Sequence, residues 1–184
     1  MMRRLARSLV IVAAALSLAA LAGADAADEY ELKAAMYVNL LRLVEWPAGR
    51  LADPASPLVI GVAGSEDMAR ALDAIAARKS ASTGRRITVK RIAGMAGIEE
   101  CNSLFIGGGD RKRIEGTLAA VSKNPVLTVG ESDRFISLGG MIDLALNDDD
   151  RVQIEVNLDA AHNARLEISS QVLKIAVIKA GGGK

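Results

Sequence analysis

Between residues 28 and 44 the hydrophobic positions recur at the spacing of a helix. One stripe runs at intervals of four, four and three residues: Leu32, Met36, Leu40 and Leu43. Val38 and Leu41 lie on the other side, so we expect this helix to be packed between other elements or to cover a partner. Trp46 precedes Pro47, and a residue before proline avoids the helical region, so the helix is expected to end before it.

From residue 58 onward, short apolar runs alternate with longer amphipathic segments. The apolar runs predict strands at residues 58–63, 87–92, 104–106 and 126–129. The segments between them predict helices at residues 66–77 and 111–121, with Ser65 and Asp110 as their N-caps. Residues 132–138 fit either a short helix or a turn. Alternating strands and helices predict a parallel sheet that is covered on both faces.

The last third of the chain has a different pattern. Residues 141–146 and 152–156 predict two strands joined by a polar turn, which is a hairpin signal. Asp159 is expected to cap a helix that runs to residue 165, and Ser169 and Ser170 to cap a last helix at residues 171–179. The expected fold is a single α/β domain, with a mostly parallel central sheet flanked by helices and a C-terminal antiparallel hairpin at the edge.

The first 26 residues are typical of a secretory signal peptide. Three arginines precede an apolar run at residues 9–22, and small residues at Ala24 and Ala26 predict cleavage after Ala26. An uncleaved membrane anchor is the alternative interpretation. Removal of 26 of the 184 residues leaves a mature domain of 158, residues 27–184. No further apolar run reaches spanning length, so the mature protein is expected outside the cytoplasm and not in the membrane.

The charge balance argues against nucleic-acid binding. The leader holds three of the 23 basic and one of the 22 acidic residues, so the mature chain carries a net charge of about −1. It therefore has no basic excess with which to neutralise phosphates.

Three glycines, Gly107 to Gly109, follow an apolar run and could suggest a phosphate-binding loop. The lysine and hydroxyl of a P-loop are missing, however, and Asp110 would repel a phosphate at the start of the next helix. We therefore interpret this segment as a strand-to-helix turn and expect no nucleotide or other cofactor.

The remaining candidate chemistry is sparse. Cys101 is the only cysteine, so an internal disulfide is excluded, and a small buried side chain is the simplest role for it. His162 is the only histidine and has no partner residues for a metal site or a catalytic triad. Residues 147–150 are better explained as a turn than as a calcium loop. These features predict a binding protein without catalytic or metal-ligating residues, and not an enzyme.

Five segments carry a resemblance to a known family. The stretch "ELKAAMYVNLLRLVEWP" resembles the opening of the YfiR family, and "CNSLFIG", "GGMIDLAL", "RVQIEVNLDAA" and "LEISSQVLKIA" are similar to its later blocks in the same order. The resemblance implies a periplasmic α/β protein, usually a homodimer. It also implies that the protein binds the periplasmic part of an inner-membrane diguanylate cyclase and represses it, which lowers cyclic di-GMP and biofilm formation.

The chain departs from the family in its cysteines. Family members often carry further cysteines, and Asp143 stands where one of them can follow the Gly-Gly block. Because Cys101 has no partner, redox control of repression is not expected here.

Carried over by motif, the candidates for partner contact are Trp46, Ile142, Glu155 and Asn157. Structural roles stay open for each of them. Trp46 can close the edge of the core, and Ile142 fits an inward strand position. Glu155 alternates with Ile154 and Val156 and should point away from the core, which makes it the best surface candidate. An alternative function is small-ligand binding in a crevice at the carboxyl ends of the strands, near Gly64 and Gly107.

Overall fold

The computed structural model describes residues 29–51, 53, 55–83, 85–149 and 151–182. The predicted signal peptide, residues 1–26, lies outside the described residues. Of the helices that are described, none combines the length and the apolar character needed to cross a membrane.

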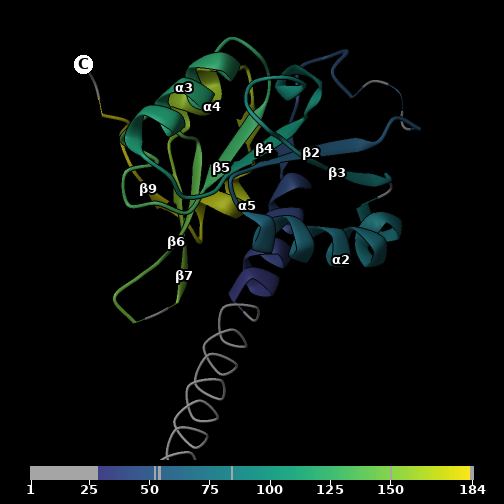
Figure 1. Ribbon diagram of the computed structural model, residues 1–184, viewed down its shortest axis with the longest axis horizontal. Coiled ribbons are helices and arrows are strands. Elements are labelled where there is room, and N and C mark those ends of the chain that lie inside the picture. The colour runs from purple at the N-terminus through teal and green to yellow at the C-terminus, as the bar shows by residue number, and fades with distance from the viewer. Residues whose placement is uncertain (1–28, 52, 54, 84, 150, 183–184) are drawn as a thin grey trace, which may run out of the picture.

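A seven-stranded sheet forms the centre of the domain (Figure 1). Its strands, in spatial order, are β3 (Ile87–Arg91), β2 (Leu58–Ala63), β4 (Ser103–Ile106), β5 (Leu127–Gly130), β6 (Ile142–Leu146), β7 (Val152–Val156) and β9 (Val177–Ile178). The pairs from β3 to β6 are parallel, β6 and β7 form the antiparallel hairpin, and β9 is parallel to β7. The α/β fold with a mostly parallel sheet is therefore confirmed.

Helices cover both faces of the sheet because side chains alternate along its strands (Figure 1). Phe105 on β4 packs into the larger core, beneath the N-terminal helix (residues 29–41) and α2 (Glu66–Thr83). Its neighbours Leu104 and Ile106 pack on the opposite face, against α3 (Arg111–Val121). Helix α2 continues past its predicted end at residue 77. The prediction for α3 is confirmed, with the Asp110 side chain accepting the Arg113 backbone N–H at 2.9 Å.

The N-terminal helix ends earlier than its apolar pattern predicts. Residues 42 and 43 form a turn, and β1 (Val44–Glu45) pairs with β8 (Glu167–Ile168) in a second, two-stranded antiparallel sheet. The buried face is also wider than the predicted stripe and includes Ala34, Tyr37, Val38, Leu40 and Leu41. Leu32, which the stripe placed inward, is 52% exposed.

The C-terminal region contains two corrections. Asn157, and not Asp159, caps α4 (Leu158–Asn163) by accepting the Ala160 N–H. The predicted helix at residues 171–179 is also wrong, because α5 spans only Ser170–Leu173, with Ser169 as its cap. After α5 the β-branched Val177 and Ile178 gain a ladder with Glu155 and Val156, so the sheet extends one strand beyond the hairpin.

Candidate functional site

Three of the exposed large apolar side chains lie at the C-terminal end of the sheet, and two of them are the most exposed among the described residues. Ile175 is 70% exposed, Ile178 55% and Val177 40%. Strand β9 is the last strand of the sheet, with β7 as its one neighbour among the described strands. An edge strand leaves backbone hydrogen-bonding groups unpaired, and Val177 and Ile178 offer exposed apolar contact area on its two faces. We call these three residues, with Glu155 and Lys179, the C-terminal edge.

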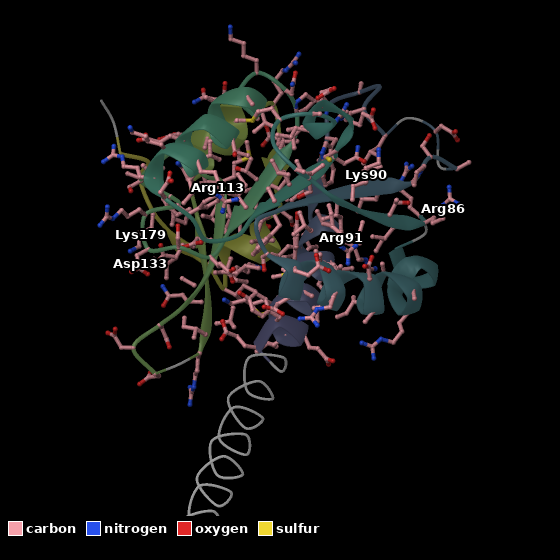
Figure 2. The ribbon with its side chains drawn as sticks, in the orientation of Figure 1. Arg86, Lys90, Arg91, Arg113, Asp133 and Lys179 are labelled. Atoms are coloured by element: carbon pink, nitrogen blue, oxygen red, sulfur yellow. The ribbon has the colours of Figure 1, made fainter. Side chains whose placement is uncertain are left out.

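An ion pair borders the C-terminal edge. Glu155 on β7 and Lys179, one residue past β9, lie 3.3 Å apart, and the Glu155 side chain is 22% exposed. Glu155 thus points away from the core, as its alternation with buried Ile154 and Val156 predicts, but it already has a partner inside the fold. In Figure 2, Lys179 lies on the opposite side of the molecule from Arg86, Lys90 and Arg91 around β3.

Asp143 lies beside Glu155 on the neighbouring strand. The sequence analysis did not identify it as a site residue. It sits on β6, opposite Glu155, and is 1% exposed. Burial and the nearby charge of Glu155 raise the pKa of Asp143 from 3.8 to about 7, although a hydrogen bond from the Ser132 N–H, 3.1 Å away, opposes the shift. The sequence feature that could have identified it is its position, since it is the one charged residue within the apolar segment Met141 to Leu146.

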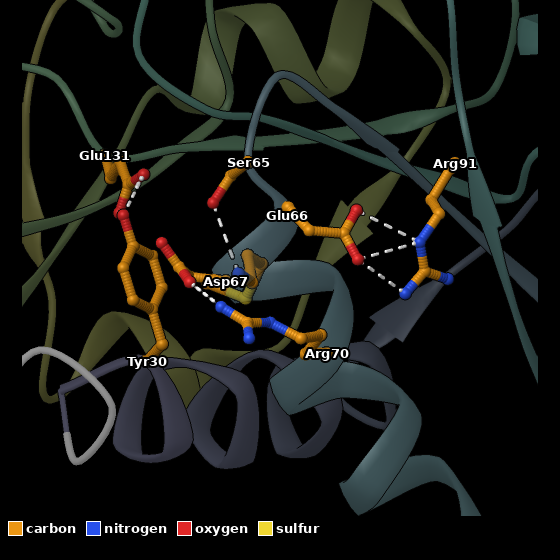
Figure 3. A network of polar contacts seen from close by, with 8 residues as sticks. Tyr30, Ser65, Glu66, Asp67, Arg70, Arg91 and Glu131 are labelled. Atoms are coloured by element: carbon orange, nitrogen blue, oxygen red, sulfur yellow. Dashed lines mark hydrogen bonds and ion pairs between the residues drawn. The ribbon is translucent and has the colours of Figure 1, made fainter. Parts of the chain in front are cut away.

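The N-terminal helix is anchored next to Asp143, at the carboxyl end of β5. The buried Lys33 ammonium pairs with Glu131 at 2.9 Å. The Tyr30 hydroxyl donates to the same carboxylate at 3.1 Å (Figure 3). Burial disfavours the Lys33 charge, but hydrogen bonds to Glu29 and Glu131 outweigh it and raise the pKa of Lys33. The "LKAA" block of the sequence therefore fixes this helix to the sheet.

The start of α2 is held by separate contacts (Figure 3). Ser65 accepts the Met68 N–H, and Arg91 on β3 pairs with Glu66 at 3.0 Å. Because the Arg91 and Glu66 side chains are about half exposed, this pair contributes little to stability and positions the helix on the sheet.

The carboxyl ends of β2 and β4 form the switch point of the sheet, since the helices that follow them pack on opposite faces. A ligand crevice was the alternative expectation there. The Arg113 side chain covers this point, with its Nη2 donating to the Gly107 carbonyl at 2.9 Å. A side chain on Gly64 or Gly109 would collide with the same guanidinium, and both glycines have positive φ. The glycines thus make room for Arg113 in a strand-to-helix turn.

The structure places the four predicted contact residues in different surroundings. Trp46 is half-buried, donates from Nε1 to the Asn102 carbonyl at 3.3 Å and lines a pocket of about 270 Å³. It lies beside the amino ends of β2 and β4, whereas Glu155 is on β7, three strands further along the sheet. Ile142 is fully buried in the core, and Asn157 is 3% exposed because it caps α4. Of the four, Glu155 alone belongs to the C-terminal edge.

Cys101 is fully buried, as expected, with its Sγ donating to the Gly97 carbonyl at 3.5 Å. Burial raises the pKa of its thiol, which keeps it protonated and unreactive. Within the described part of the chain, no three His, Cys, Asp or Glu side chains gather in a way that could hold a metal ion.

A similar architecture occurs in a solved structure. A search of curated proteins finds no significant match. A solved structure of a conserved domain protein from Vibrio cholerae O1 biovar El Tor has a TM-score of 0.56 and 15% identity, over 82% of this chain and 60% of that one. An ABC domain in complex with L-Trp from Streptococcus pneumonia has a TM-score of 0.43 and 13% identity, over 65% of this chain and 54% of that one. At 15% identity the likeness to the Vibrio structure concerns the fold alone, and this chain spans about 60% of the length of that structure.

A family model described as YfiR/HmsC-like matches residues 30–177, which run from the anchored N-terminal helix to the start of β9. The match includes every block on which the sequence resemblance rests. The chain therefore belongs to the YfiR/HmsC-like family.

Proposed function

We propose that this protein is a periplasmic regulator that binds the periplasmic part of a membrane diguanylate cyclase and holds the cyclase inactive. Membership of the YfiR/HmsC-like family supports the class of partner and the compartment. The signal-peptide pattern of residues 1–26 agrees with export. Repression would lower cyclic di-GMP in the cytoplasm and with it biofilm formation.

The exposed apolar C-terminal edge is the observation that carries the proposal. Ile175, Val177 and Ile178 are each at least 40% exposed, and they follow one another within four residues. Burying such side chains against a partner removes apolar surface from water, which favours the complex. The ion pair of Glu155 and Lys179 beside them would contribute orientation more than affinity.

A regulatory role by binding agrees with what the described residues offer. The switch-point crevice, where an α/β enzyme would hold its ligand, contains the Arg113 side chain. The homodimer that the family resemblance implies stays a prediction, which light scattering of the mature protein will test.

The test has two stages. The tagged mature protein is first used to capture partners from membranes, and mass spectrometry identifies the retained cyclase. Ile178→Glu is then compared with the wild type for capture of that cyclase and for cellular cyclic di-GMP. We expect at least a tenfold loss of capture and a rise in cyclic di-GMP.

Leu32→Glu is the matched control, because Leu32 is a similarly exposed apolar residue on the N-terminal helix, outside the C-terminal edge. It should leave capture and cyclic di-GMP unchanged. Equal capture by wild type and Ile178→Glu, or an equal loss in both variants, would overturn the assignment of the edge. Capture of no cyclase by the wild type would overturn the function itself.

A further inference from the structure

A second site lies at the opposite end of the sheet from the switch point. A pocket of about 360 Å³ opens between the carboxyl end of α3 and helix α4. Its floor is a row of three buried residues at the ends of neighbouring strands: Thr128, Met141 and Asn157. The volume lies at the lower end of the range of small-molecule sites, about 300–1,000 Å³.

The two polar residues of the floor use their acceptors on the backbone. The Thr128 hydroxyl oxygen accepts the Met141 N–H at 3.1 Å, and Asn157 Oδ1 accepts the Ala160 N–H at 3.0 Å. Across the described residues, neither the Thr128 O–H nor the Asn157 Nδ2 hydrogens are donated to an acceptor. Both residues are at least 97% buried, so these donors meet little bulk water. Buried donors of this kind are normally satisfied, and here the pocket is the space that remains for a partner.

The chain itself closes one side of the pocket. Gly181 and Gly182 follow β9 and line the pocket wall. A Cβ on Gly181 would lie 2.7 Å from Asn157 Nδ2, and one on Gly182 would lie 2.7 Å from the Ser137 carbonyl oxygen. Glycine at position 181 therefore keeps a side chain away from the Asn157 donor, and glycine at position 182 lets the chain pass close to Ser137.

The charges around the pocket determine which kind of ligand it can bind. The carboxyl end of α3, with Val121 and Ser122 in the wall, presents the negative end of a helix dipole. The Asp159 carboxylate lies on the rim and makes no ion pair with a described residue. Both features disfavour an anionic ligand, and Asp159, in the first turn of α4, also offsets the positive end of that short helix. Leu118, Val121 and Met141 supply apolar contact.

We infer that this pocket binds a small neutral molecule with an apolar body, whose carbonyl oxygen accepts hydrogen bonds from Thr128 and Asn157. The site is separate from the proposed partner surface, although residues 179–182 connect the two. The inference does not depend on the identity of a cyclase, and its test needs only the purified protein.

The test uses two probes with one apolar chain and different polar groups: hexanamide and hexanoate. Each is titrated into the ¹⁵N-labelled mature protein, and backbone amide shifts are followed. We expect saturable shifts with hexanamide at Thr128, Met141, Asn157, Gly181 and Gly182. Hexanoate should bind at least fivefold more weakly. Equal binding of amide and carboxylate, shifts scattered over other surfaces, or no saturable shift with hexanamide would overturn the inference.

Asn157→Asp is the sharpest variant, because a carboxylate oxygen still caps α4 while the two donors are lost. We expect at least a fivefold loss of hexanamide affinity. Thr128→Ser keeps the hydroxyl and should bind within twofold of the wild type. Ala160→Leu fills the pocket from α4 without touching either donor, and it should abolish binding. Wild-type affinity in both Asn157→Asp and Ala160→Leu would sink the proposal.

Discussion

Asp143 and Glu155 occupy directly opposed positions on the antiparallel strands β6 and β7. Two carboxyl side chains therefore lie side by side on one face of the sheet, and like charges in such positions are destabilising. Glu155 has Lys179 as a counter-ion, whereas Asp143 is buried with a single backbone hydrogen bond from Ser132. Burial and the neighbouring charge of Glu155 therefore raise the pKa of Asp143.

The first prediction is that the domain loses stability as pH rises from about 4 to about 7. The folded-state pKa of Asp143 is about 7 against an ordinary 3.8, so the folded state binds a proton more tightly than the unfolded chain. This contribution is complete below the ordinary pKa and is lost as pH rises through the folded one. Urea denaturation should give a free energy of unfolding on the order of 2 kcal/mol lower at pH 8 than at pH 5.

Two variants test whether Asp143, and not a neighbouring charged group, causes this pH dependence of stability. The other charged groups that act on it are Glu155, Lys33 and Asp133. Asn at position 143 can still accept the Ser132 N–H but does not ionise, so Asp143→Asn should flatten the profile between pH 5 and 8. Asp133→Asn, at an exposed neighbour, should keep the wild-type slope. An unchanged slope in Asp143→Asn would contradict the assignment.

The parts of the fold that rest on local pattern were predictable from sequence. Asp110 as the cap of α3 and the order of strands and helices follow from spacing and cap chemistry. Strand β9 could not be predicted in this way, because the segment around Val172 and Ile175 has helical spacing and its true partner, β7, is some 20 residues away. Tertiary pairing thus overrides local periodicity at the C-terminus.

The candidate site was predictable only in part, for the same reason. The alternation of polar and apolar residues correctly predicted that Glu155 points away from the core. Its ion pair with Lys179 could not be predicted, because it depends on the pairing of β9 with β7. From its residue type, Asn157 is expected on the surface. Its burial and its role as the N-cap of α4 depend on where that helix begins. Gly140 packs against a buried ring, a role that no local sequence pattern reveals.

The packing of Gly140 leads to the second prediction. The Phe135 ring is fully buried and packs against Gly130 and Gly140, where an added Cβ would overlap the ring. Gly140→Ala should therefore destabilise the domain by about 1–3 kcal/mol, since the ring has no free space to move into. Gly108→Ala is the control, because nothing lies within 4 Å of its Cβ position. Thermal melts with a similar midpoint for both variants would show that the ring is not confined.

The third prediction concerns the three glycines after β4. We expect no binding of ATP, GTP or cyclic di-GMP, because Arg113 fills the turn and Asp110 places a carboxylate at the start of α3. Isothermal titration calorimetry at millimolar nucleotide should show only heats of dilution, for the wild type and for Arg113→Met. Micromolar affinity for any of the three would show that the turn is a phosphate site after all.

The last prediction concerns the ion pair of the C-terminal edge and rests on the proposed function. Glu155→Lys replaces an attraction across 3.3 Å with two neighbouring ammonium groups, and so loosens the chain just after β9. The cost to global stability should stay within about 1 kcal/mol, because partly exposed ion pairs contribute little. Since Val177 and Ile178 form β9 and immediately precede Lys179, Glu155→Lys should displace them, release the cyclase and raise cyclic di-GMP while the protein stays folded and abundant.

The charge-swapped variant Glu155→Lys with Lys179→Glu distinguishes how the pair acts. If the pair holds β9 in place, the swap restores it, and cyclic di-GMP should return to within about twofold of the wild-type level. If Glu155 instead meets a basic residue of the partner, the swap leaves cyclic di-GMP high. We expect restoration, because the Glu155 side chain is only 22% exposed and already contacts Lys179. Cyclic di-GMP measured by mass spectrometry, with immunoblots for protein level, decides between the two. Unchanged cyclic di-GMP in the single variant at normal protein levels would remove Glu155 from the partner surface.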